Sequence, residues 1–193
     1  MVGRLAVVLA FDWSAELSRP VNQIAQMEVR LKIKGLTEFP SKLKSTVIPK
    51  ILKQWTFLYL SFAQKHFVEA SQGSGDWPPL KPSTIAGRRG KGKDVRILRD
   101  TGTLFRALDP VAKAPGSLQK MDAENFTVEV GYGGSAGHPK GRATISDIAE
   151  FHNFGMGHNP IRRIIISPTD IERERMRKVA NETIQKELNK SVN

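Results

Sequence analysis

A helical repeat of large apolar residues over residues 41–70 constrains the fold more than any other feature of the chain. Pro49 lies inside this repeat and lacks the N–H that the preceding turn needs, so it is expected to kink the helix or to mark a fresh start. Steps of three and four residues place the large side chains on one helix face, and rings of this size usually belong to a core rather than a ligand site. The members of the repeat are Leu43, Val47, Ile51, Leu52, Trp55, Leu58, Tyr59 and Phe62.

Two segments show the period-two alternation of a half-buried strand. Val29, Leu31 and Ile33 alternate with basic residues, and residues 126–132 alternate again. Residues 164–166 are three isoleucines, which predict a short buried strand or an extended segment.

Three further helices are predicted, over about residues 97–108, 146–154 and 168–188. Gly155 is the expected left-handed stop of the second helix, and Ser167 is the expected cap of the third, with Pro168 in its first position. Residues 76–100 have no clear periodicity and are interpreted as a mobile loop. The side chains expected to face inward are Ile148, Phe151 and Phe154 in the second helix and Ile171, Met176, Val179, Ile184 and Leu188 in the third.

Together these patterns predict an α+β fold, in which two longer helices pack on a small, mostly antiparallel sheet. Residues 27–193 are expected to form a single domain, and residues 1–26 are interpreted as an N-terminal extension. The longest apolar run, residues 5–11, is far shorter than the roughly 20 residues of a spanning helix. No membrane segment is therefore predicted.

The formal net charge of +11 favours a nucleic acid, an anionic membrane or an acidic protein as a partner, although many basic side chains simply cover a solvated face. The positive charge recurs in two long glycine-rich loops, residues 87–93 and 133–142. The chain has no cysteine, which excludes disulfides, thiolate zinc sites and a cysteine nucleophile.

Residues 151–160, FHNFGMGHNP, contain His152, Asn153 and His158, the residue types of a metal-dependent His-Asn-His nuclease. Zinc sites normally take three or four clustered ligands, and too few further ligands lie nearby in the sequence. The preferred interpretation is a structural corner that Pro160 leads into the isoleucine run. No catalytic residue, metal or cofactor is predicted, and a nuclease centred on the two histidines remains a competing hypothesis.

The order of the motifs resembles the tailed-phage virion morphogenesis family, which comprises Mu-type and P2-type tail completion proteins and related head–tail joining proteins. The matching pieces are Trp77-Pro78-Pro79-Leu80, Ser83-Thr84, Ile97-Leu98-Arg99-Asp100-Thr101-Gly102-x-Leu104, Ala149-Glu150-Phe151-His152-Asn153-Phe154-Gly155 and Pro160-Ile161-Arg162-Arg163-Ile164. The chain departs from the family pattern at Arg163, where a second proline is expected, and in the long basic loop before Ile97.

The resemblance implies a structural virion protein and not an enzyme. It would be a tail completion or neck ring component, in a tail terminator or head–tail connector role, assembled in the host cytoplasm. The implied partners are further copies of the chain in a ring, expected as a hexamer, other neck, tail tube or connector proteins, and DNA in the lumen. The alternative is a basic nucleic-acid-binding protein that acts through residues 87–93 and 133–142.

Two sets of residues carry the expected roles. Asp100, Thr101 and Gly102 are expected to fix the turn that starts the short helix, with Asp100 or Thr101 as its cap. The other expected structural positions are Trp77, Leu80, Leu98, Leu104, Phe154, Gly155 and Pro160. The expected subunit or partner contacts are Arg88, Arg89, Lys91, Lys93, His152, Asn153, Arg162 and Arg163. Of these, His152 and Asn153 are expected to bond to backbone groups, and the arginine pair 162–163 either to form salt bridges across a subunit boundary or to stay solvated.

Overall fold

The computed structural model describes residues 5–9 and 43–192. The strand predicted at residues 29–33 and the beginning of the long helical repeat lie outside the described residues. Of the N-terminal extension, only residues 5–9 are described.

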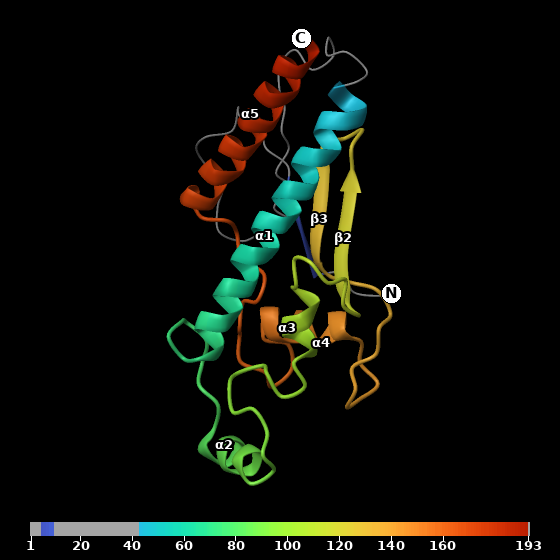
Figure 1. Cartoon of the computed structure of the whole chain (residues 1–193). Helices are drawn as coiled ribbons and strands as arrows, with labels where there is room; N and C mark the ends of the chain where they lie inside the picture. The colour runs from blue at the N-terminus through green and yellow to red at the C-terminus, as the bar shows by residue number, and fades with distance from the viewer. Residues whose placement is uncertain (1–4, 10–42, 193) are drawn as a thin grey trace. The chain divides into compact units, whose positions relative to one another are not determined.

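The described residues form an α+β fold with two long helices, which confirms the predicted fold class (Figure 1). The sheet has the strand order β1-β3-β2, and β2 and β3 form an antiparallel hairpin. The elements are β1 (Leu5–Leu9), a π-helix η2 (Leu43–Val47), α1 (Ile48–Ser71), α2 (Pro82–Arg89), α3 (Thr103–Ala107), β2 (Ser117–Asp122), β3 (Thr127–Tyr132), α4 (Ile145–Phe154) and α5 (Asp170–Val192).

The contacts divide the chain into two compact units. Of the described residues, the first unit contains residues 5–6, Leu60–Leu118 and Gly131–Ile166, and the second contains residues 7–9, 43–59, Gln119–Val130 and 167–192. Because α1 and the β2–β3 hairpin each contribute residues to both units, the single domain expected over residues 27–193 stays a prediction.

The core of the first unit is built around aromatic side chains. The Phe67 and Trp77 rings meet edge to face with their centroids 5.0 Å apart. The buried Tyr132 hydroxyl donates to the Leu104 carbonyl oxygen at 2.8 Å, so this polar group is satisfied inside the core. Other buried members of this core are Leu60, Ala63, Leu108, Ile145, Ala149 and Ile164.

The core of the second unit contains the aromatic stripe at the start of α1. The Trp55 and Tyr59 side chains are buried, and Trp55 Nε1 donates to the Met176 carbonyl oxygen of α5 at 2.9 Å. Val128 and Val130 of β3 are buried at alternate positions, as the period-two pattern predicts. The interpretation of the stripe as core is therefore confirmed.

Two predicted helix boundaries are confirmed. Pro49 is the second residue of α1, so the α-helix starts afresh beside it, directly after the π-helix η2. Helix α4 ends at Gly155, whose φ of 68° is in the left-handed region that glycine adopts without strain. Its beginning is fixed by a capping box, in which Thr144 and Asp147 each accept a backbone N–H of the other.

Two predicted caps lie elsewhere. Helix α3 begins after Gly102, whose φ is 71°, so neither Asp100 nor Thr101 occupies the cap position, although the Thr101 hydroxyl accepts from the Thr103 N–H at 3.5 Å. Helix α5 begins at Asp170 rather than after Ser167, because the Thr169 hydroxyl accepts from the Glu172 N–H at 3.3 Å.

Further predictions need correction, and one strand was not predicted. The segment 76–100 is not a loop throughout, because α2 occupies Pro82–Arg89. The sequence patterns predict no strand at Ser117–Asp122, where the structure has β2. Phe154 and Ile171 do not face inward, since their side chains are 42% and 74% exposed. Residues 164–166 form no strand, so of the two predicted alternatives only the extended segment remains, and Ile164 is buried as expected.

Candidate functional site

The segment Trp77–Pro78 and the segment Arg162–Arg163 lie far apart in the sequence but are hydrogen-bonded to each other in the first unit. We call this contact the junction. Trp77 Nε1 donates to the Arg163 carbonyl oxygen at 3.1 Å. Arg162 Nε and Nη2 donate to the Pro78 carbonyl oxygen at 3.3 and 3.0 Å. Arg162 is only 6% exposed, so the salt bridge expected from it across a subunit boundary is wrong. Arg163 is exposed, and only its backbone takes part in this junction.

Asn153 joins a third segment, residues 149–155, to the same junction. Its side-chain oxygen accepts from the Ile164 and Ile165 N–H groups at 2.9 and 3.1 Å. The Arg162 N–H donates to the His152 carbonyl oxygen at 2.7 Å. The chain after Gly155 therefore turns back and lies against the end of α4. The backbone hydrogen bonds expected of Asn153 are present, and they lie within the chain.

The His152 ring does not make the hydrogen bond expected of it at Nδ1. This atom is buried and has no hydrogen-bond partner. Burial, together with the charge of Arg162, lowers the pKa of His152 to about 4, so the ring is neutral at pH 7. His158 is exposed, and no three His, Asp or Glu groups of the described residues are placed to hold a metal ion.

The first basic loop is folded against its own backbone. Arg88 Nη1 donates to the carbonyl oxygens of Asp94 and Arg96, at 3.3 and 3.0 Å. The Asp94 carboxylate forms a two-pronged ion pair with Arg96, with its shortest distance 2.6 Å, and lies 3.8 Å from Arg99. The hydrogen bonds from Arg96 lower the pKa of Asp94.

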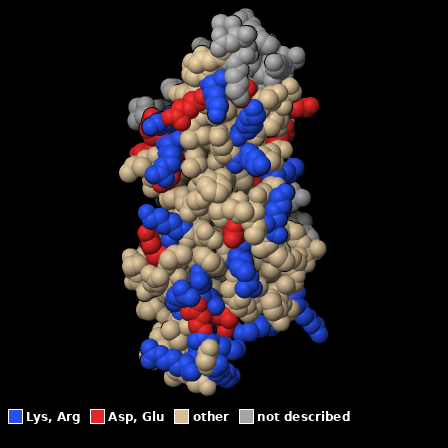
Figure 2. Space-filling view, viewed as in Figure 1, with Lys and Arg blue, Asp and Glu red and all other residues tan. Residues whose placement is uncertain are grey.

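The second basic loop meets the first at Asp100. Lys140 Nζ forms an ion pair with the Asp100 carboxylate, which lowers the pKa of Asp100. Lys140 also neighbours Lys93, and its side-chain hydrogen bond, together with its positive charge, lowers the pKa of Lys93. Arg89 and Lys91 are exposed beside them. Figure 2 shows blue side chains gathered at the lower end of the view, where Figure 1 places α2 and the loop that follows it.

The remaining motif residues shape the turn before α3. Leu98 has a positive φ of 57°, which is uncommon for a residue with a side chain. The Thr101 hydroxyl lies 2.9 Å from the Thr103 hydroxyl and 3.3 Å from His138 Nε2. Leu104 is buried, Leu80 and Leu98 are half-buried, and Pro160 is exposed.

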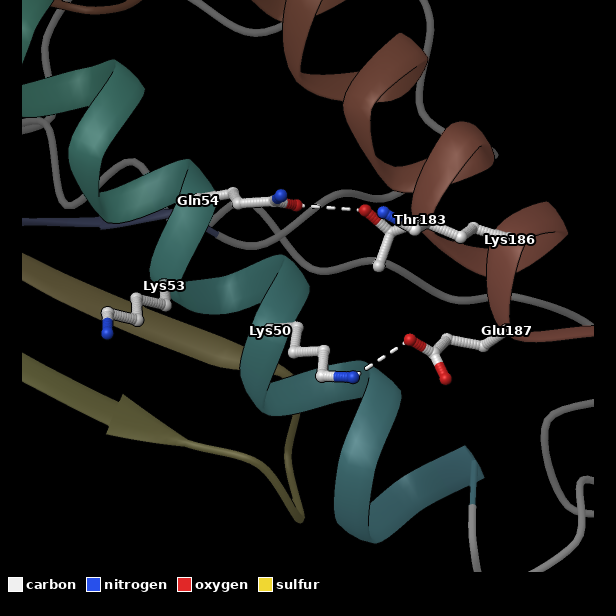
Figure 3. Close-up of a pocket in the computed structure, with 6 residues that line it drawn as sticks. All are labelled: Lys50, Lys53, Gln54, Thr183, Lys186 and Glu187. Atoms are coloured by element: carbon white, nitrogen blue, oxygen red, sulfur yellow. Dashed lines mark hydrogen bonds and ion pairs between the residues drawn. The ribbon is translucent and has the colours of Figure 1, made fainter. Parts of the chain in front are cut away.

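A groove of about 350 Å³ lies between α1 and α5 in the second unit (Figure 3). Lys50 Nζ bonds Glu187 Oε1 at 2.8 Å, and the Thr183 hydroxyl donates to Gln54 Oε1 at 2.9 Å. These bonds cross from one helix to the other and use the polar ends of four lining residues. The groove is therefore interpreted as part of the packing of the two helices.

One exposed apolar surface is not predicted by the sequence patterns. Phe154, Met156 and Ile161 surround the turn after α4 and are 42%, 45% and 55% exposed. We call these three residues the apolar corner. The glycines and the proline around them were interpreted as turn residues, and a single sequence does not show on which side of a turn its large residues lie.

Comparisons with protein-family models, with curated proteins and with solved structures give no match to this chain. Among the helices of residues 43–192, none is long and apolar enough to cross a membrane.

Proposed function

We propose that the chain is a structural virion protein of a tailed bacteriophage, a tail completion or neck ring component that joins the tail to the head. The observation that supports this best is the junction in the first unit. The motif residues Trp77, Asn153 and Arg162 all bond to backbone groups of other motif segments. Residues used in this way hold a particular surface in shape, which is what an assembly protein requires, and none of them is left to act on a substrate.

The proposed ring needs a surface that copies of the chain share, and the apolar corner is our candidate for it. Interfaces are anchored by a few large apolar or aromatic side chains at their centre. Phe154, Met156 and Ile161 lie within eight residues of one another on a turn that Asn153 and Gly155 hold rigidly. A ring, proposed as a hexamer, would bury this corner against the neighbouring copy or against a tail tube or connector protein.

Mass photometry and negative-stain microscopy test the proposal, on the chain alone and mixed with purified phage tails and neck complexes. We expect closed rings, or stoichiometric addition of the chain to the head-proximal end of tails. A chain that stays monomeric at all concentrations and binds neither tails nor necks would contradict the proposed function.

A matched pair of triple variants tests the apolar corner. Phe154→Ser, Met156→Ser and Ile161→Ser together should weaken assembly by at least about 100-fold, because each lost anchor contributes roughly 1–2 kcal/mol. The control carries the same kind of change at the exposed Val111, Met121 and Ile171, and it should assemble like the parent chain. Equal assembly of both variants would exclude the corner as the shared surface.

A further inference from the structure

We propose that the two glycine-rich loops together form one binding surface for the phosphate backbone of duplex DNA. The inference concerns the isolated chain and does not depend on the proposed virion role. We call this the two-loop basic surface. Its side chains are Arg88, Arg89, Lys91 and Lys93 from the first loop and Lys140 and Arg142 from the second.

The structure brings the two loops to one place. Lys140 reaches across to form an ion pair with Asp100, which follows the first loop, and it is close enough to Lys93 to lower the pKa of that group. Two ammonium groups held this close repel each other, and Asp100 compensates only one positive charge. A phosphate oxygen placed between Lys93 and Lys140 would relieve the remaining repulsion.

The positive charge of this surface is only partly neutralised by the described residues around it, since Asp100 pairs with Lys140 alone. Its two segments, 87–93 and 133–142, contain six lysines and arginines and no acidic residue. The two nearest carboxylates already have partners: Asp94 pairs with Arg96, and Asp100 pairs with Lys140. Arg89, Lys91 and Arg142 are exposed, and the structure shows no ion pair for any of them among the described residues.

The side chains that are missing from this surface favour a nucleic acid backbone over a protein. Protein interfaces are anchored by aromatic and apolar residues, and segments 87–93 and 133–142 of the described chain expose no large hydrophobic side chain. Single-stranded nucleic acids are held largely by stacking on aromatic rings, and these segments contain no Phe, Tyr or Trp and only one histidine, His138, which is half-buried. Cations alone are sufficient for the phosphates of a duplex.

The glycines of the loops leave the loop backbone open to a ligand. A Cβ atom added at Gly92, Gly137 or Gly141 would meet no atom within 4 Å, so these positions border open space. With no side chain there, a rigid ligand can approach the loop backbone closely. We therefore expect binding that is independent of base sequence and strongly dependent on salt.

Fluorescence anisotropy with a labelled 20-base-pair duplex of random sequence, titrated between 50 and 200 mM salt, tests the inference. The test variant carries Arg89→Gln, Lys91→Gln and Arg142→Gln. The control carries Lys53→Gln, Lys120→Gln and Lys186→Gln, exposed lysines of the second unit that change the net charge equally. Circular dichroism and thermal melting should show both variants folded like the parent, because every substituted side chain is exposed.

Each neutralised phosphate contributes about −0.9 to the slope of log K against log salt. The test variant should therefore lose about 3 from the magnitude of this slope and roughly two to three decades of affinity at 0.1 M salt, while the control keeps the parent slope. An unchanged slope in the test variant, or an equal loss in the control, would overturn the proposal. So would a poly-glutamate peptide that displaces the duplex as well as unlabelled DNA of equal charge does, since that result indicates an acidic protein partner.

Discussion

Replacing Asn153 by alanine removes the one side chain that satisfies two backbone N–H groups in the junction. Its oxygen accepts from Ile164 and Ile165 at 2.9 and 3.1 Å. Alanine leaves both donors without a partner in a part-buried position, where water reaches them only poorly. The buried Ile164 side chain depends on this backbone position, so the change should also loosen the core beneath it.

The expected loss follows from the count of donors. An unsatisfied buried donor costs about 1–3 kcal/mol, and the part-buried setting favours the lower half of this range for each of the two. Asn153 also lies near the end of α4, where alanine favours the helix by roughly 0.5 kcal/mol. The free energy of unfolding should therefore fall by about 1.5–3.5 kcal/mol.

Guanidinium unfolding, followed by tryptophan fluorescence and by circular dichroism, measures this loss from the shift in midpoint at constant slope. Asn153→Asp keeps an oxygen acceptor and should recover at least half of the loss at pH 7. Asn159→Ala, whose exposed amide bonds only the Met156 carbonyl oxygen, is the matched control and should change stability by less than about 0.5 kcal/mol. A loss below about 0.5 kcal/mol in Asn153→Ala, equal to that of the control, would refute the role of the bridge.

Two further predictions concern the first unit. Gly116→Ala should cost about 2–4 kcal/mol, because Gly116 has φ 81° and a Cβ there would lie 2.7 Å from Ile145 Cγ2; a thermal melt that stays within about 2 °C of the parent would contradict this. The native pKa of His152, about 4, lies below its unfolded value near 6.5, so the unfolded chain binds more protons between these values and stability should fall as pH drops through this window. With a discount for partial exposure, denaturation at pH 7 and 4.5 should show about 1–2 kcal/mol less acid destabilisation in His152→Gln than in the parent chain, and equal pH dependence would count against it.

The elements that the sequence predicts well are those with a strong local signal. The stripe through Trp55 and Tyr59 defines α1, alternation defines β3, and Gly155 defines the end of α4. In each case the signal is either the spacing of apolar side chains or the need for a left-handed residue, and it is contained within a few neighbouring residues. Local patterns of this kind are visible without knowledge of the fold.

The missed elements lack such a signal. Helix α2 buries no residue, so its sequence carries no apolar period, and glycine and charge suggested a loop. Strand β2 lies at the edge of the sheet next to β3 and has no fully buried residue. Its conformation depends on pairing with β3, which its own sequence does not indicate.

The candidate site also combines features that the sequence predicts with features that only the fold reveals. The motif positions were found from their order along the chain, but the partner of Arg162 is a carbonyl oxygen 84 residues away. An arginine in a basic sequence is most often exposed, so the sequence favoured a surface role. Only the fold shows that this guanidinium is buried in the junction and that Lys140 meets Asp100 across 40 residues.

The distribution of partners also explains why a net charge of +11 says little until the fold is known. Helix α5 contains six basic and five acidic residues, and its arginines pair with acids three positions earlier, as Arg173 does with Asp170. Such pairs contribute little to stability, but they cancel the charge of the helix at short range. Arg162 donates to the Pro78 carbonyl oxygen inside the first unit and serves the fold. The excess positive charge is therefore concentrated in the two loops that meet at Asp100. Substituting lysines elsewhere should change the net charge but not the binding of a polyanion.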